Sequence, residues 1–158
     1  MSSWQDQIEQ ELMKKALNQA KKAFNKNEVP IGAIVVDKNN KIIGKGYNQV
    51  ESKMCQSEHA EIIAIKNACK KIGDWRLEDC TLYVTLEPCS MCISLIILSR
   101  ISRCIYATKS NIFGFSVDKH INFELYRSPI LIKEGACKVE AQNLLGTFFK
   151  NQRKIKKL

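Results

Sequence analysis

Two short stretches of the chain each open a predicted helix, and a predicted strand lies between them. The first is Glu58-His59-Ala60-Glu61, at the start of a helix over about 59–72. The second is Glu87-Pro88-Cys89-Ser90-Met91-Cys92, where Pro88 ends a strand over about 79–86 and can begin a helix. Helices that alternate with a strand in this way predict a sheet covered by helices, and therefore the α/β class.

The apolar spacing of the rest of the chain predicts the remaining elements. They are an amphipathic helix over about 4–24, a hairpin of strands 31–36 and 42–47, short strands at 103–108 and 130–133, and a terminal helix over about 139–157 with Leu144, Leu145, Phe148 and Phe149 inward. Residues 109–130 show no regular pattern. We expect a three-layer α/β/α fold, with a mixed five-stranded sheet and helices on both faces. No linker divides residues 1–158, so a single domain is expected.

The charge of the chain is strongly positive and unevenly placed. The formal net charge is +9, and residues 80–158 hold 12 basic and only 5 acidic side chains. The tail over about 139–158 is basic, with Lys150, Arg153, Lys154, Lys156 and Lys157 close together. This asymmetry indicates a polyanionic partner, with nucleic acid first and an anionic membrane second; the alternative is a solvated tail that aids solubility.

Neither a membrane span nor a disulfide framework is expected. The longest apolar run, 93–98, is interrupted by Ser94 and is far shorter than the roughly 18 residues of a membrane span. The N-terminal residues lack the pattern of a secretory signal, so we expect a cytoplasmic protein. Seven cysteines in such a chain are expected to be reduced. Some are candidate metal ligands, and Cys55, Cys69, Cys80, Cys104 and Cys137, which have no ligand spacing, are assigned to packing.

Cys89 and Cys92 form a C-x-x-C pair, which by itself is ambiguous. Such a pair occurs in redox sites and in structural zinc sites, and also by chance. No second pair follows at zinc-ribbon spacing. If the two predicted helix starts meet at one sheet edge, His59 joins the cysteines. Three protein ligands leave the fourth position of tetrahedral zinc open to water, which would lose a proton near neutral pH.

Glu61 lies two residues after His59, close to the predicted metal but facing differently. A carboxylate there can take a proton from water and deliver it to a leaving nitrogen; the alternative is an acid that only stabilises the helix N-terminus. Together, H-x-E followed by P-C-x-x-C is the known signature of zinc-dependent base deaminases.

The chain resembles the bacterial tRNA-specific adenosine deaminases of the cytidine deaminase-like superfamily, from about residue 10 to 153. The closest agreement lies in 28–33, 46–48, 59–61, 82–92 and 148–149. This resemblance implies hydrolytic, zinc-dependent conversion of adenosine to inosine at the wobble position of a tRNA anticodon loop. It also implies the cytidine deaminase-like fold and a homodimer with one zinc ion per subunit.

The resemblance also implies roles for individual residues. His59, Cys89 and Cys92 would hold the zinc ion, and Glu61 would transfer protons. Asn48 would hydrogen-bond the target nucleotide, Val29 and Ala60 would line the base pocket, and Phe148, Phe149 and Lys150 would contact RNA. The core alternative for the two phenylalanines is strong, and we expect at least one of them to be buried.

The segment 109–114 departs from the family pattern. Ser110 stands where an aspartate is usual, and Ile112 where a lysine is common. This leaves the zinc chemistry intact but changes the expected RNA contacts. Residues 111–132 match the family poorly, and His120 within them is assigned to the surface.

Two other functions remain open from the sequence. A deaminase of a free nucleobase or nucleoside (cytosine, guanine or cytidine) would share the whole zinc signature. A non-catalytic RNA-binding module with structural zinc would need a fourth protein ligand, for which Cys55 is the nearest unassigned candidate.

Overall fold

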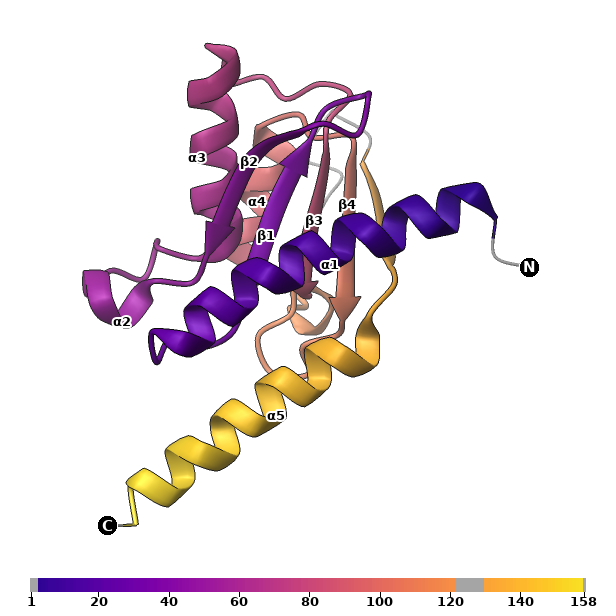
Figure 1. The fold of residues 1–158 in the computed structure, drawn as a ribbon. Coiled ribbons are helices and arrows are strands. Elements are labelled where there is room, and N and C mark those ends of the chain that lie inside the picture. Colours follow the sequence, from indigo (N-terminus) through magenta and orange to yellow (C-terminus); the bar gives the residue numbers. More distant parts are fainter. Residues whose placement is uncertain (1–2, 122–129, 158) are drawn as a thin grey trace.

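A computed structural model describes residues 3–121 and 130–157 of the chain (Figure 1). The elements follow in this order: α1 (Trp4–Asn25), β1 (Gly32–Val36), β2 (Ile42–Tyr47), α2 (Val50–Lys53), α3 (Ala60–Ile72), β3 (Thr81–Leu86), α4 (Ser90–Leu98), β4 (Arg103–Thr108), the 3-10 turn η1 (Phe115–Val117), β5 (Leu131–Glu134) and α5 (Lys138–Ile155). Within these residues, no helix is both long and apolar enough to cross a membrane.

The five strands form one mixed sheet in the order β2-β1-β3-β4-β5. β1 pairs antiparallel with both β2 and β3, whereas β3–β4 and β4–β5 are parallel. Every residue of the inner strand β1 is buried, which explains its unbroken apolar sequence. The predicted mixed five-stranded sheet is confirmed.

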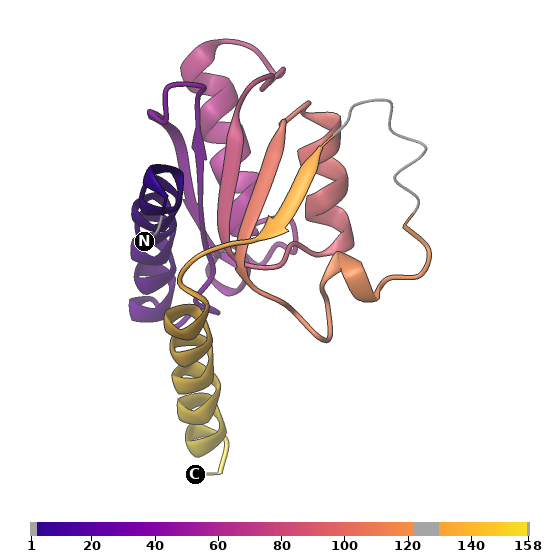
Figure 2. The same cartoon turned by 90° about the vertical axis from the view of Figure 1, so that its right-hand side faces the viewer.

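Helices cover both faces of the sheet. Figure 2 shows the sheet nearly edge-on, with α1 and α5 on one side and α4 on the other. One apolar cluster joins α1 to one face of the inner strands, through Ile34 of β1, Tyr83 of β3 and Ile105 of β4. A second cluster joins α3 and α4 to the opposite face of the same strands. The three-layer α/β/α arrangement is therefore confirmed.

Several predicted details were wrong or incomplete. The sequence pattern missed α2 and η1, which have four and three residues and show no periodicity. Phe149 was expected to face inward with Phe148, but 44% of its surface is exposed. Cys55 was assigned to packing, yet it lies at the surface, where its sulfur contacts the Ser57 hydroxyl at 3.1 Å. His120 is exposed, as predicted. Part of the poorly matching segment 111–132, residues 122–129, lies outside the described residues.

Candidate metal and catalytic site

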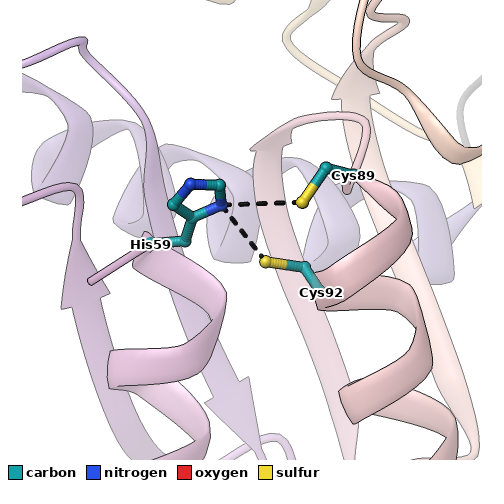
Figure 3. A group of neighbouring side chains, drawn as sticks. All are labelled: His59, Cys89 and Cys92. Atoms are coloured by element: carbon teal, nitrogen blue, oxygen red, sulfur yellow. Dashed lines mark hydrogen bonds between the residues drawn. The ribbon is translucent and has the colours of Figure 1, made fainter. Parts of the chain in front are cut away.

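Two helices begin at the same edge of the sheet and bring three candidate ligands together. His59 is the N-cap residue of α3, and Cys89 is the N-cap residue of α4. Cys92 lies in the first turn of α4. Figure 3 shows the imidazole pointing from one helix start toward the two sulfur atoms on the other. The convergence predicted from the sequence is present.

The distances between these side chains suit a tetrahedral ion. His59 Nδ1 lies 3.6 Å from Cys89 Sγ and 3.4 Å from Cys92 Sγ. One ligand atom from each of the three residues lies within 4.8 Å of the other two. Zinc bonds of usual length at tetrahedral angles would place the nitrogen and each sulfur about 3.5 Å apart. An imidazole and two thiolates are also the donors that zinc prefers, so the residues fit the ion.

The electrostatics of the site favour a thiolate. The pKa of Cys89 falls to about 4, first because of its hydrogen bond with Cys92 and then because of that with His59, despite burial. The hydrogen bond with Cys89 raises the pKa of Cys92, and burial adds to this effect. The pKa of His59 is raised, chiefly by its hydrogen bond with Cys89. At least one sulfur is therefore a thiolate at neutral pH, at a helix N-terminus that stabilises negative charge.

Glu61 lies in the first turn of α3 and is only 4% exposed. Burial raises its pKa to about 7, an effect partly opposed by the nearby His59. Such a carboxyl group can both accept and donate a proton near neutral pH. An acid that only stabilised the helix N-terminus would not need to be buried or to lie next to the metal ligands. These two features of Glu61 therefore favour the role in proton transfer.

Three linked loops surround the start of α3. The backbone N–H of Asn48 donates to Ile31 O at 3.0 Å, and that of Gln49 donates to Glu58 O at 2.9 Å. Asn48 and Ala60 are buried, and Val29 is half-buried. Val29 and Asn48 therefore lie on loops that are hydrogen-bonded to one another, and Ala60 begins α3 directly after His59.

Sequence analysis missed the residue that supports these loops. The Glu28 carboxylate is 1% exposed and accepts hydrogen bonds from the backbone N–H groups of Glu51 at 3.1 Å and Ser52 at 2.7 Å. It therefore caps α2, just after the loop that carries Asn48. The sequence offered no signal for this contact, because α2 is too short to be recognised.

The three expected RNA-contact residues of α5 differ in their exposure to solvent. Phe148 is buried, and its ring meets that of Phe24 edge to face with centroids 6.1 Å apart. Phe149 and Lys150 are exposed. Gln152, one turn later, donates a hydrogen bond to the side chain of Asn27, which precedes Glu28 and Val29. The exposed end of α5 therefore runs beside the loops of the site, and Phe148 anchors it.

A cavity of about 350 Å³ adjoins the candidate metal centre. Its lining includes Cys89, Ser90 and Met91 from the start of α4. The rest of its lining comes from residues 112–118, which begin in the segment that departs from the family pattern: Ile112, Phe113, Gly114, Val117 and Asp118. Of the three candidate ligands, only Cys89 lines this cavity, which therefore lies beside the metal centre.

Comparison with known proteins identifies the family of this site. Residues 6–108 match the cytidine and deoxycytidylate deaminase zinc-binding region. A tRNA-specific adenosine deaminase from Bacillus subtilis is 40% identical over 147 residues, covering 92% of this chain and 91% of that protein.

Solved structures agree with this assignment. One from a study of A-to-I editing by tRNA:A34 deaminases superposes with a TM-score of 0.76 at 31% identity, covering 85% of this chain and 99% of the other. A guanine deaminase from Bacillus subtilis gives a TM-score of 0.63 at 27% identity, covering 89% and 92%. The chain therefore belongs to the zinc-dependent cytidine and deoxycytidylate deaminase family and, within it, to the tRNA-specific adenosine deaminases.

Proposed function

We propose that this protein converts adenosine to inosine at the wobble position of a tRNA anticodon loop. The observation that carries the chemistry is the convergence of His59, Cys89 and Cys92 beside the buried carboxyl group of Glu61. The choice of substrate is supported by relatives that match nearly the whole chain, including the basic α5.

The reaction adds water at C6 of adenine and releases ammonia. His59, Cys89 and Cys92 would hold the zinc ion, which would activate a water molecule for the attack. Glu61 would take one proton from the attacking water and deliver it to the purine ring. As the amino group leaves, Glu61 would take the proton of the new C6 hydroxyl group and pass it to that nitrogen, so that ammonia departs and the carbonyl of inosine forms. Its buried position next to the ligands suits this transfer, because proton transfer requires hydrogen-bond distances.

The substrate side of the site is formed by the loops beside α3. In this proposal, Asn48 hydrogen-bonds the target nucleotide, and Val29 and Ala60 line the pocket for its base. The target base has to leave its stack to enter, which costs least in a single-stranded anticodon loop. A tRNA substrate also agrees with the expected cytoplasmic location.

Binding of the rest of the anticodon stem-loop is assigned to the exposed end of α5. Phe149 offers an exposed ring and Lys150 a positive charge, while the buried Phe148 acts by holding them in place. We also propose a homodimer with one zinc ion per subunit, on the strength of the family assignment.

A substrate panel tests this proposal. Zinc-loaded protein is incubated with a tRNA that has adenosine at the wobble position, and separately with free adenosine, cytidine, cytosine and guanine. Inosine formed only in the tRNA, at that position, is the expected result. Turnover of a free base with the tRNA unchanged would favour the free nucleobase deaminase, and zinc binding without any turnover would favour the RNA-binding module.

A further inference from the structure

Glu87 is a buried carboxylate that the proposed mechanism does not use. It follows β3, two residues before the ligand Cys89, and is 3% exposed. Burying a carboxylate is costly unless hydrogen bonds compensate it. One oxygen accepts the backbone N–H of Ser110 at 3.0 Å, and the other accepts that of Ser116 at 3.0 Å. Both oxygens therefore hold the same segment of chain.

The residues that follow Glu87 hold this segment as well. The Pro88 carbonyl accepts the backbone N–H of Phe115 at 2.8 Å, and Cys89 forms an isolated β-bridge with Gly114. The Ser90 hydroxyl donates to the Asp118 carboxylate. Four consecutive residues that include a metal ligand are thus fastened to residues 110–118.

Gly114 shows how closely the carboxylate and the segment fit. A Cβ atom on Gly114 would lie 2.4 Å from Glu87 Oε2 and 2.6 Å from the Ser110 carbonyl oxygen. Any larger residue would displace one of these groups. The carboxylate of Glu87 therefore fills the inside of the turn that the segment makes.

The segment held in this way is one wall of the cavity beside Cys89. On that wall, the neighbouring side chains of Ile112 and Phe113 are 76% and 75% exposed, so they present an apolar surface to a ligand. We propose that Glu87 is a positioning residue: its carboxylate fixes residues 110–116 as the wall against which the nucleic-acid substrate is seated beside the metal centre. This inference rests on the proposed function, which it extends by one residue.

Replacing Glu87 with Gln keeps its size but leaves one acceptor oxygen for two N–H donors. In the Glu87→Gln protein, amide hydrogen exchange over 109–118 should rise about 10-fold to 100-fold, as expected for losing one charge-assisted hydrogen bond. Zinc content should stay at one ion per chain. KM should rise by a similar factor, with a smaller change in kcat, because the zinc ligands and Glu61 remain in place.

Two further variants separate positioning from stability. Glu9 is a second buried carboxylate, 5% exposed, which pairs with Arg103 at 2.8 Å and Lys133 at 2.9 Å. Glu9→Gln should lower the melting temperature without changing KM. Gly114→Ala disturbs the Glu87 contact from the other side, so it should raise KM as Glu87→Gln does, and it serves if Glu87→Gln does not fold.

The outcomes decide clearly between the alternatives. Faster exchange confined to 109–118 together with a raised KM supports the proposal. Unchanged exchange, or faster exchange with an unchanged KM, overturns it. A loss of kcat alone that Glu9→Gln reproduces also overturns it, since Glu87 would then only stabilise the fold. If the wild-type protein leaves tRNA unmodified, the proposed function fails separately, and the KM comparison is made on whichever panel compound is deaminated.

Discussion

Cys92 and Cys55 show that the ability of a cysteine to bind zinc depends on where its side chain lies. Cys92 is buried beside His59 in the candidate site, whereas Cys55 is exposed and contacts Ser57. We expect Cys92→Ser to bind far less than one zinc ion per chain, because only two of the three ligands keep their preferred donor atoms. Deaminase activity should be lost with the metal.

Cys55→Ser is the matched control, since it makes the same chemical change at the surface. Zinc content, measured by atomic emission after dialysis, should remain at one per chain in this control. A Cys92→Ser protein that retained a full equivalent of zinc, or a Cys55→Ser protein that lost it, would contradict the assigned ligand set and restore Cys55 as a candidate ligand.

For single residues, the sequence identified the metal ligands but not the buried carboxylates that hold the loops of the site in place. His59, Cys89 and Cys92 were recognisable because metal ligation needs particular residue types at short spacings at the starts of helices. Glu87 and Glu28 were not, because their partners are backbone N–H groups more than 20 residues away, and any residue except proline can supply such a group. The bond between Ser110 and Glu87 does not depend on the side chain at position 110, because Glu87 accepts the backbone N–H group.

Among the elements, the packing of helices on β1 and β2 depends on glycine. A Cβ atom on Gly32 would lie 2.2 Å from the Ala16 carbonyl oxygen of α1, and one on Gly44 would lie 2.2 Å from that of Ala64 in α3. Both helices therefore lie directly against strand backbone. Gly46 allows the same close approach at Ala60. It therefore determines how near the start of α3, and with it His59, lies to the sheet.

Gly44→Ala tests this close packing. The added methyl group would push α3 off the sheet, and overpacking of this kind should cost about 3 kcal/mol of unfolding free energy. Gly146 in α5 has open space around its ideal Cβ position. Gly146→Ala should therefore stabilise the protein by about 0.5–1 kcal/mol through helix propensity.

Urea denaturation followed by circular dichroism measures both changes. Equal effects of the two substitutions would show that α3 does not need the close approach.

The five strands and the long helices were predictable, whereas the short helix α2 and the 3-10 turn η1 were not. β2 and β4 were predicted with their observed bounds, because β2 directly follows the polar turn 37–41 and β4 has an apolar centre over 104–107. α2 and η1 arise from tertiary contacts: the Glu28 carboxylate caps the first, and the segment held by Glu87 contains the second. Neither contact can be recognised from the residues within α2 or η1.

Over the whole molecule, the positive charge should make RNA binding depend on salt. The end of α5 carries exposed basic side chains beside the loops of the site, whereas the turn between β1 and β2 carries Lys38 and Lys41 at the opposite end of the sheet. Each phosphate contact to single-stranded nucleic acid contributes a slope of about −0.7 to log K against log salt concentration.

The double variant Lys150→Ala/Arg153→Ala should therefore weaken tRNA binding and reduce the magnitude of that slope by about 1 to 2. Lys38→Ala/Lys41→Ala removes the same net charge and should leave the slope nearly unchanged. Fluorescence anisotropy with labelled tRNA over a series of salt concentrations measures both. Equal slopes for the two double variants would mean that net charge, not its position on α5, determines binding.

The account as a whole depends on Glu61 as the group that transfers protons beside the zinc ligands. The most direct test is inosine formation at the wobble position, measured by nucleoside mass spectrometry for Glu61→Gln, alongside zinc content. Glu58→Gln is the control, since it removes a carboxylate from the same segment whose partner is Lys66 at 3.9 Å. We predict that Glu61→Gln keeps one zinc ion per chain and loses about 10²-fold to 10⁴-fold in rate, while Glu58→Gln stays active. Undiminished inosine formation by a zinc-loaded Glu61→Gln protein would contradict the account.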